Sequence, residues 1–176
     1  MKFAAALSFL FLSCSAFLMA DNAALAAKAR GQIGVTTSYD GSYQVIPYPN
    51  GDVPKNTGVC TDVVIRALRA FGLDLQKAVH EDMKANFSRY PNLWGLKGTD
   101  RSIDHRRVPN LRTFFTRKGW SVPVTKTAAD YLPGDLVTWN LDAGGVPHIG
   151  IVSDKKTEQG TPLIIHNIGS GTQEED

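Results

Sequence analysis

The chain has 176 residues, of which 43% are hydrophobic and 20% charged, a composition typical of a globular protein and unlike that of a disordered chain or a coiled coil. Its 19 basic and 17 acidic residues leave a formal net charge of +2, which is too small to indicate nucleic-acid binding. Beyond the N-terminus there is no apolar run of the roughly 20 residues that a membrane-spanning helix needs. We therefore expect one globular domain with no nucleic-acid partner and no transmembrane segment.

Residues 1–20 have the layout of a secretory signal peptide, because Lys2 precedes an apolar stretch from Phe3 to Ala20 that is broken only by small or weakly polar residues. We expect a single mature domain over residues 21–176, located in the periplasm or secreted. Cleavage after Ala26 fits the small-residue rule better but would cut into the first helix. Lipidation of Cys14 is disfavoured, since the residues before it make a poor lipobox and apolar residues continue after it.

Cys60 is the one cysteine left after removal of the signal peptide, so the exported chain has no internal disulfide. Apolar residues after Cys60 recur at helical spacing and Gly72 ends the pattern, which predicts an amphipathic helix with Cys60 in its first turn. The inward positions are Val63, Val64, Ala67, Leu68 and Phe71, with Arg66 and Arg69 on the opposite face. Free backbone N–H groups at a helix N-terminus favour a thiolate and donate to an oxyanion. The position suits a nucleophile, although a small side chain buried under the preceding loop would have the same pattern.

Helical spacing and end signals predict three further helices, at residues 22–33, 74–87 and 109–119. Residues 88–107 read as an irregular loop that faces a substrate. The last third of the chain alternates between apolar and polar residues. This predicts an antiparallel meander of three strands, at residues 135–140, 147–153 and 163–167. Helices followed by strands indicate the α+β class, with the N-terminal helices packed on a small antiparallel sheet.

Two of the four histidines complete a candidate site. His148 and His166 lie on consecutive predicted strands and share a face if the register permits, so that one acts as base and the other orients it. His80 falls on the polar face of its helix and is expected to be solvated. His105 and Arg106 belong to a charged cluster that either binds an anionic group or pairs internally. The sequence has no close ligand pair of the kind that zinc sites use, so we expect no metal.

Four segments carry a family resemblance: GVCTDVVIRALRAFG, PGDLVTW, PHIGIVS and IIHNIGSG. Their order and spacing resemble those of the NlpC-type and CHAP-type cell-wall cysteine peptidases. The chain is most similar to the exported bacterial family catalogued as domain of unknown function 1287, over nearly the whole mature chain, including YPNGDVP and IDHRRVPNL. The resemblance implies a papain-like fold with Cys60 as nucleophile, His148 as base and His166 as orienter.

The resemblance also implies a tyrosine near the oxyanion. Tyr48 matches its position, while Tyr39 and Tyr43 compete for it.

The chain departs from the NlpC-type pattern around the cysteine. Val59 replaces the usual Asp, and Thr61 and Asp62 replace Ser-Gly, so we expect a differently lined substrate groove. Asp62 either stabilises the helix N-terminus or binds a substrate ammonium group. Related chains continue with a further strand, whereas this sequence stops at Asp176, so the sheet is expected to lack an edge strand.

These features predict an exported, monomeric cysteine hydrolase that cleaves an amide bond without a cofactor. Export makes peptidoglycan or its peptide fragments the expected substrate. Two alternatives stay open: a non-catalytic wall-binding module of the same fold, and an acyltransferase or esterase that uses the same residues.

Overall fold

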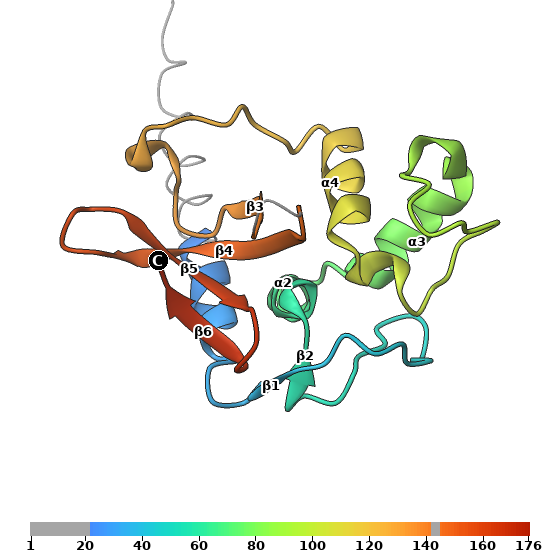
Figure 1. Ribbon diagram of the computed structural model, residues 1–176, viewed down its shortest axis with the longest axis horizontal. Helices are drawn as coiled ribbons and strands as arrows, with labels where there is room; N and C mark the ends of the chain where they lie inside the picture. The colour runs from blue at the N-terminus through green and yellow to red at the C-terminus, as the bar shows by residue number, and fades with distance from the viewer. Residues whose placement is uncertain (1–21, 142–144) are drawn as a thin grey trace, which may run out of the picture.

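The computed structural model describes residues 22–141 and 145–176 (Figure 1). It confirms the α+β class, since helices precede an antiparallel sheet along the chain. A first helix covers residues 22–30. The longer helices that follow it are α2 (Cys60–Arg69), α3 (Leu75–Ala85) and α4 (Val108–Arg117). Single 3₁₀ turns are η1 (Phe87–Arg89), η2 (Asp104–Arg106) and η3 (Ala128–Asp130).

The expected signal peptide and the Cys14 position lie outside the described residues. Among the residues that are described, no helix combines the length and the apolar character needed to cross a membrane.

The sheet has four antiparallel strands in the order β3-β4-β5-β6. Their bounds are β3 (Leu136–Asn140), β4 (Pro147–Lys156), β5 (Pro162–Asn167) and β6 (Thr172–Glu175). The first three confirm the predicted meander. The fourth is not predicted by the sequence pattern, because its residues are Thr, Gln, Glu and Glu and show no apolar alternation.

A second, two-stranded ladder lies between the first helix and α2. β1 (Ser38–Tyr39) pairs in parallel with β2 (Thr57–Gly58), and Tyr39 is in register with Gly58. This pairing brings the start of the long loop beside the residues that lead into α2. Asn167 holds the same junction from β5, because its Nδ2 donates to the Gly58 carbonyl at 3.0 Å and to the Ser38 carbonyl at 3.3 Å.

Helix α2 lies at the centre of the core. Figure 1 shows it nearly end-on, with the sheet on one side and α3 and α4 on the other. Its inward residues Val63 and Val64 are fully buried, as predicted, and share one hydrophobic cluster with Ile149, Ile151 and Ile165 of the sheet. Removing this apolar surface from water is the main contribution to the stability of the domain.

The expected inward position of Phe71 is wrong. Helix α2 ends at Arg69, and Gly72 adopts a φ of 81°, so the chain turns and leaves Phe71 45% exposed. The opposite face of α2 is largely shielded from solvent, because the loop at residues 52–57 covers it. Arg66 pairs with Asp52 at 3.0 Å and donates to the Val53 and Thr57 carbonyls, which holds that loop against the helix.

The predicted helices at 74–87 and 109–119 are confirmed with shifted ends. Asp74, where the predicted helix begins, caps α3, since its carboxylate accepts from the Gln76 amide at 3.0 Å. Phe87 falls just outside α3, in η1. Phe114 of α4 is fully buried in the core.

Gly150 of β4 provides a test of how closely the sheet is packed beside the two histidines. A Cβ at this position would clash with Cγ2 of Ile164 and lie 3.2 Å from Cβ of His166. We expect Gly150→Ala to lower the free energy of unfolding by about 1–3 kcal/mol, because overpacking forces neighbouring side chains out of position. Urea denaturation followed by circular dichroism measures the change. Gly98→Ala is the control, since nothing lies within 4 Å of its added Cβ; equal stability of the two variants would contradict the close packing.

Candidate active site

Cys60 is the first residue of α2, as predicted, and its side chain is buried. The turn in front of it is fixed by Asp62, whose carboxylate accepts from the Val59 amide at 2.7 Å. Gly58 allows this close approach, because a Cβ there would lie 3.2 Å from the Asp62 carboxylate. The cysteine therefore lies at a rigid junction between β2 and α2.

The expectation that Cys60 is a thiolate is wrong in this environment. Burial raises the pKa of the Cys60 thiol to about 11, and the negative charge of Asp62 adds to the rise. Backbone N–H groups of Ile149, Thr61 and Cys60 itself oppose it without cancelling it. At neutral pH the thiol keeps its proton, because desolvation of the sulfur outweighs the helix N-terminus.

His148 and His166 are neighbours, as the strand positions predict. Nε2 of His148 lies 2.9 Å from Nδ1 of His166, and both rings are buried. Trp139 of β3 packs edge-on against both rings, with centroid distances of 4.7 Å to His148 and 5.5 Å to His166. The indole and the strand pairing hold the two imidazoles at a fixed angle of 87°.

Both histidines are neutral at physiological pH. Burial, with a smaller contribution from His166, lowers the pKa of His148 to about 4. Burial also lowers the pKa of His166, although the Glu175 carboxylate opposes the shift. Two neutral imidazoles share a hydrogen bond only if one donates and the other accepts.

Glu175 of β6 determines which imidazole donates. Its Oε1 lies 3.3 Å from Nε2 of His166, and an ionised carboxylate only accepts hydrogen bonds. His166 therefore carries its proton on Nε2, accepts at Nδ1 from Nε2–H of His148, and leaves Nδ1 of His148 with a free lone pair. Glu175 is a site residue that the sequence analysis missed, because only the pairing of β6 with β5 brings it near His166.

The thiol approaches the histidine pair at the start of β4. The Ile149 amide is near enough to the Cys60 sulfur to lower its pKa, and Ile149 is adjacent to His148. Within residues 22–141 and 145–176, no hydrogen bond joins the Cys60 sulfur directly to His148.

Asp62, in the same first turn of α2 as Cys60, and Arg106 of η2 form a buried ion pair. The Arg106 guanidinium donates to both carboxylate oxygens of Asp62, at 3.0 and 2.9 Å, and the side chains are 2% and 4% exposed. The Arg106 carbonyl also accepts from the Thr61 hydroxyl at 3.1 Å. Of the two alternatives for Asp62, the arrangement favours stabilisation of the helix N-terminus over binding of a substrate ammonium group.

The charged cluster around His105 is packed inside the domain. Asp104, His105 and Arg106 form η2 and are all buried, which differs from the expected substrate-facing loop. Burial lowers the pKa of His105 to about 4, so this ring is neutral. The position favours internal pairing of the cluster over binding of an external anion.

The tyrosine that is electrostatically coupled to Cys60 is Tyr39, one of the two competitors of Tyr48. Burial raises the pKa of the Tyr39 hydroxyl, and the next cause is the negative charge that Cys60 would carry as a thiolate. Tyr48 instead packs edge-on against His80 of α3 at 5.3 Å. His80 is correspondingly half-buried, whereas the sequence predicts a solvated side chain. The β1-β2 ladder, which local sequence does not reveal, explains the difference between the two tyrosines.

A small hollow of about 260 Å³ lies beside His166 and Glu175. It is lined by Trp139, Ile164, His166, Ile168, Glu175 and Asp176. In the described part of the chain, no group of three or more His, Cys, Asp or Glu side chains is arranged to hold a metal ion.

Comparison with known proteins places the chain in a family. The model of the family described as "Domain of unknown function (DUF1287)" matches residues 26–176. The chain belongs to this family. It is 57% identical over 155 residues to "Uncharacterized protein YijF" of Escherichia coli strain K12, an alignment that covers 88% of this chain and 75% of YijF. The comparison with solved structures gives no significant match.

The raised thiol pKa of this DUF1287 chain can be measured by alkylation. In a Cys14→Ser background, where Cys60 is the remaining thiol, we expect the iodoacetamide rate to rise about tenfold per pH unit between about pH 7 and about pH 10, because only the thiolate reacts. In urea the thiol regains its ordinary pKa of about 8.5, so the rate should level off above about pH 9. A plateau below about pH 8 in the folded protein would contradict the effect of burial.

Proposed function

We propose that this DUF1287 chain is a papain-like cysteine hydrolase that cleaves an amide bond. The observation that carries the proposal is the relay from Glu175 through His166 to His148, which leaves Nδ1 of His148 unprotonated at the strand end next to Cys60. A base held in one tautomer by a second and a third group, beside a nucleophile at a helix N-terminus, is the arrangement that acyl-transfer chemistry requires.

In the proposed mechanism the Cys60 thiol and the His148 imidazole are both neutral before the substrate reacts. As the sulfur of Cys60 attacks the amide carbonyl, its proton passes to Nδ1 of His148. The imidazolium that forms is stabilised by His166, which is in turn held by Glu175. His148 then returns the proton to the departing amine, and a water molecule, deprotonated by the same imidazole, releases the acyl group from the sulfur.

The oxyanion of the tetrahedral intermediate is proposed to lie at the N-terminus of α2. The backbone N–H of Cys60 is a donor there, because the first amides of a helix have no intrahelical partner. The Tyr39 hydroxyl is the second donor proposed, in place of Tyr48, on the ground of its electrostatic coupling to Cys60.

The proposed substrate is peptidoglycan or its peptide fragments. This part of the proposal rests on the resemblance to NlpC-type and CHAP-type enzymes and on the signal-like sequence of residues 1–20, which together suggest a periplasmic or secreted enzyme.

The central test compares side-chain removals along the proposed relay. With purified muropeptides and mass spectrometry of the products, we expect Cys60→Ala to abolish cleavage and His148→Ala to lower kcat by about a hundredfold or more, because the first removes the nucleophile and the second the base. His166→Ala should cost less, about tenfold to a hundredfold, since it orients the base. His80→Ala is the control and should retain activity. Cleavage by a folded Cys60→Ala protein would rule out the proposal.

The two tyrosines separate the proposed oxyanion site from the alternative. Tyr39→Phe removes one donor to the oxyanion and should lower kcat by about a hundredfold with little change in KM. Tyr48→Phe should leave kcat within about twofold, because its ring packs on α3. A large loss of kcat in Tyr48→Phe with little change in Tyr39→Phe would instead indicate that Tyr48 donates to the oxyanion.

A second candidate function is a non-catalytic wall-binding module. The protonated thiol and the lack of a direct hydrogen bond from Cys60 to His148 within the described residues favour it. Such a module would sediment with insoluble peptidoglycan and release no fragments, and Cys60→Ala would bind as well as the original chain.

A further inference from the structure

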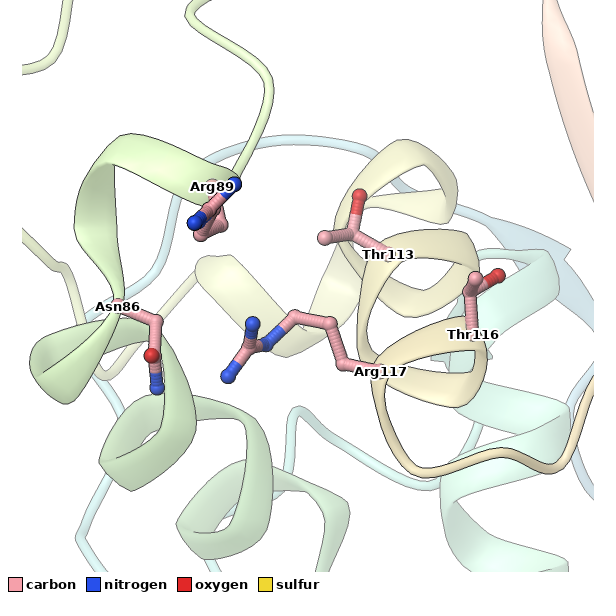
Figure 2. A pocket seen from close by; sticks show the side chains of 5 residues that line it. All are labelled: Asn86, Arg89, Thr113, Thr116 and Arg117. Carbon is pink, nitrogen blue, oxygen red and sulfur yellow. The ribbon is translucent and has the colours of Figure 1, made fainter.

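A separate hollow of about 540 Å³ lies between the end of α3 and one face of α4. Its lining residues are Asn86, Arg89, Thr113, Thr116 and Arg117 (Figure 2). Figure 2 shows the Arg117 guanidinium extending from α4 into the space toward Asn86, with Arg89 across the same space on the η1 side. None of these residues belongs to the site around Cys60.

Arg117 is held in place by a carboxylate beneath it. Nε of Arg117 donates to Asp82 at 2.7 Å, and the Tyr90 hydroxyl and the Lys118 ammonium donate to the same carboxylate at 2.9 and 3.1 Å. These partners lower the pKa of Asp82 to about 2, with Arg117 as the largest cause. Asp82 therefore engages Arg117 through Nε. In the described part of the chain, the two Nη groups of Arg117 make no hydrogen bond.

Arg89 adds a second guanidinium to the hollow, and this one has no carboxylate partner in the described part of the chain. Among residues 22–141 and 145–176 its side chain makes no hydrogen bond and no ion pair, and its backbone N–H donates to the Asn86 carbonyl at 2.9 Å. Arg117 and Lys118 share the single carboxylate of Asp82, so this carboxylate does not also balance the Arg89 guanidinium on the other side of the hollow. The hydroxyls of Thr113 and Thr116 are engaged with Pro109 and Ser121, so they form a neutral wall.

We propose that this hollow binds an oxyanion group, a phosphate or a carboxylate, between the guanidinium groups of Arg89 and Arg117. Planar guanidinium forks match the oxygen pairs of these groups and bind them in charge-assisted hydrogen bonds. The surplus positive charge of a concave site attracts anions further. The inference goes beyond the proposed hydrolase, because it requires no residue of that site and holds whether or not the chain cleaves a substrate.

Isothermal titration calorimetry of the full chain with sodium phosphate or sodium malonate, at an ionic strength held constant with sodium chloride, tests the proposal. We expect saturable binding that Arg89→Gln weakens about tenfold or more, the loss that follows from removing a charge-assisted hydrogen bond. Arg89→Gln is the informative variant, since Arg117→Gln would also release Asp82. Arg117→Lys keeps a positive charge beside Asp82 but replaces the planar guanidinium with an ammonium group, so this variant should also bind the anion more weakly.

Lys84→Gln on the exposed side of α3 is the control, because it removes the same unit charge outside the hollow. It should bind phosphate as the original chain does. Tighter binding of phosphate identifies a phosphorylated ligand and tighter binding of malonate a dicarboxylate, and either result supports an oxyanion site. No saturable heat beyond that of sodium chloride, or equal affinity of the original chain and a folded Arg89→Gln variant, would overturn the proposal.

Discussion

The ion pair between Asp62 and Arg106 fixes the N-terminus of α2 and, with it, the sulfur of Cys60. Each member of the pair also makes a second contact, since Asp62 accepts from the Val59 amide and the Arg106 carbonyl accepts from the Thr61 hydroxyl. Two charges this deeply buried are tolerable only together, because loss of one partner leaves the other without water and typically costs about 3–5 kcal/mol. The first turn of α2 therefore has little freedom to shift, and the residues that contact the sulfur keep their positions.

Burial sets the electrostatic character of the whole site. The same exclusion of water that raises the pKa of Cys60 lowers the pKa of His148, so both groups are neutral at physiological pH. This differs from a site that stores a thiolate and an imidazolium. A neutral site of this kind is poorly reactive toward oxidants and alkylating agents.

Local sequence predicts those features that depend on neighbours along the chain. The spacing of Val63 and Val64 and the cap at Asp74 locate α2 and α3, and alternation places His148 and His166 on adjacent strands. The proximity of Tyr39 to Cys60, the pairing of Asp62 with Arg106 and the contact of Glu175 with His166 depend on segments far apart in the chain. Strands β1 and β6 are too short or too polar to show an alternation of apolar and polar residues in the sequence. The protonation state of the Cys60 thiol could not be predicted either, because it depends on burial by residues from distant parts of the chain.

The two glutamates of β6 point to opposite faces of the sheet, since successive side chains of a strand alternate. Glu174 binds Arg30 of the first helix, and Glu175 contacts His166. The outermost strand thus joins the earliest described helix to the histidine relay. A nascent chain acquires the carboxylate of that relay only when β6 has been added and has paired with β5. A protease that clips the chain after Asn167 would leave the cysteine and both histidines in place yet remove the group that selects their tautomers.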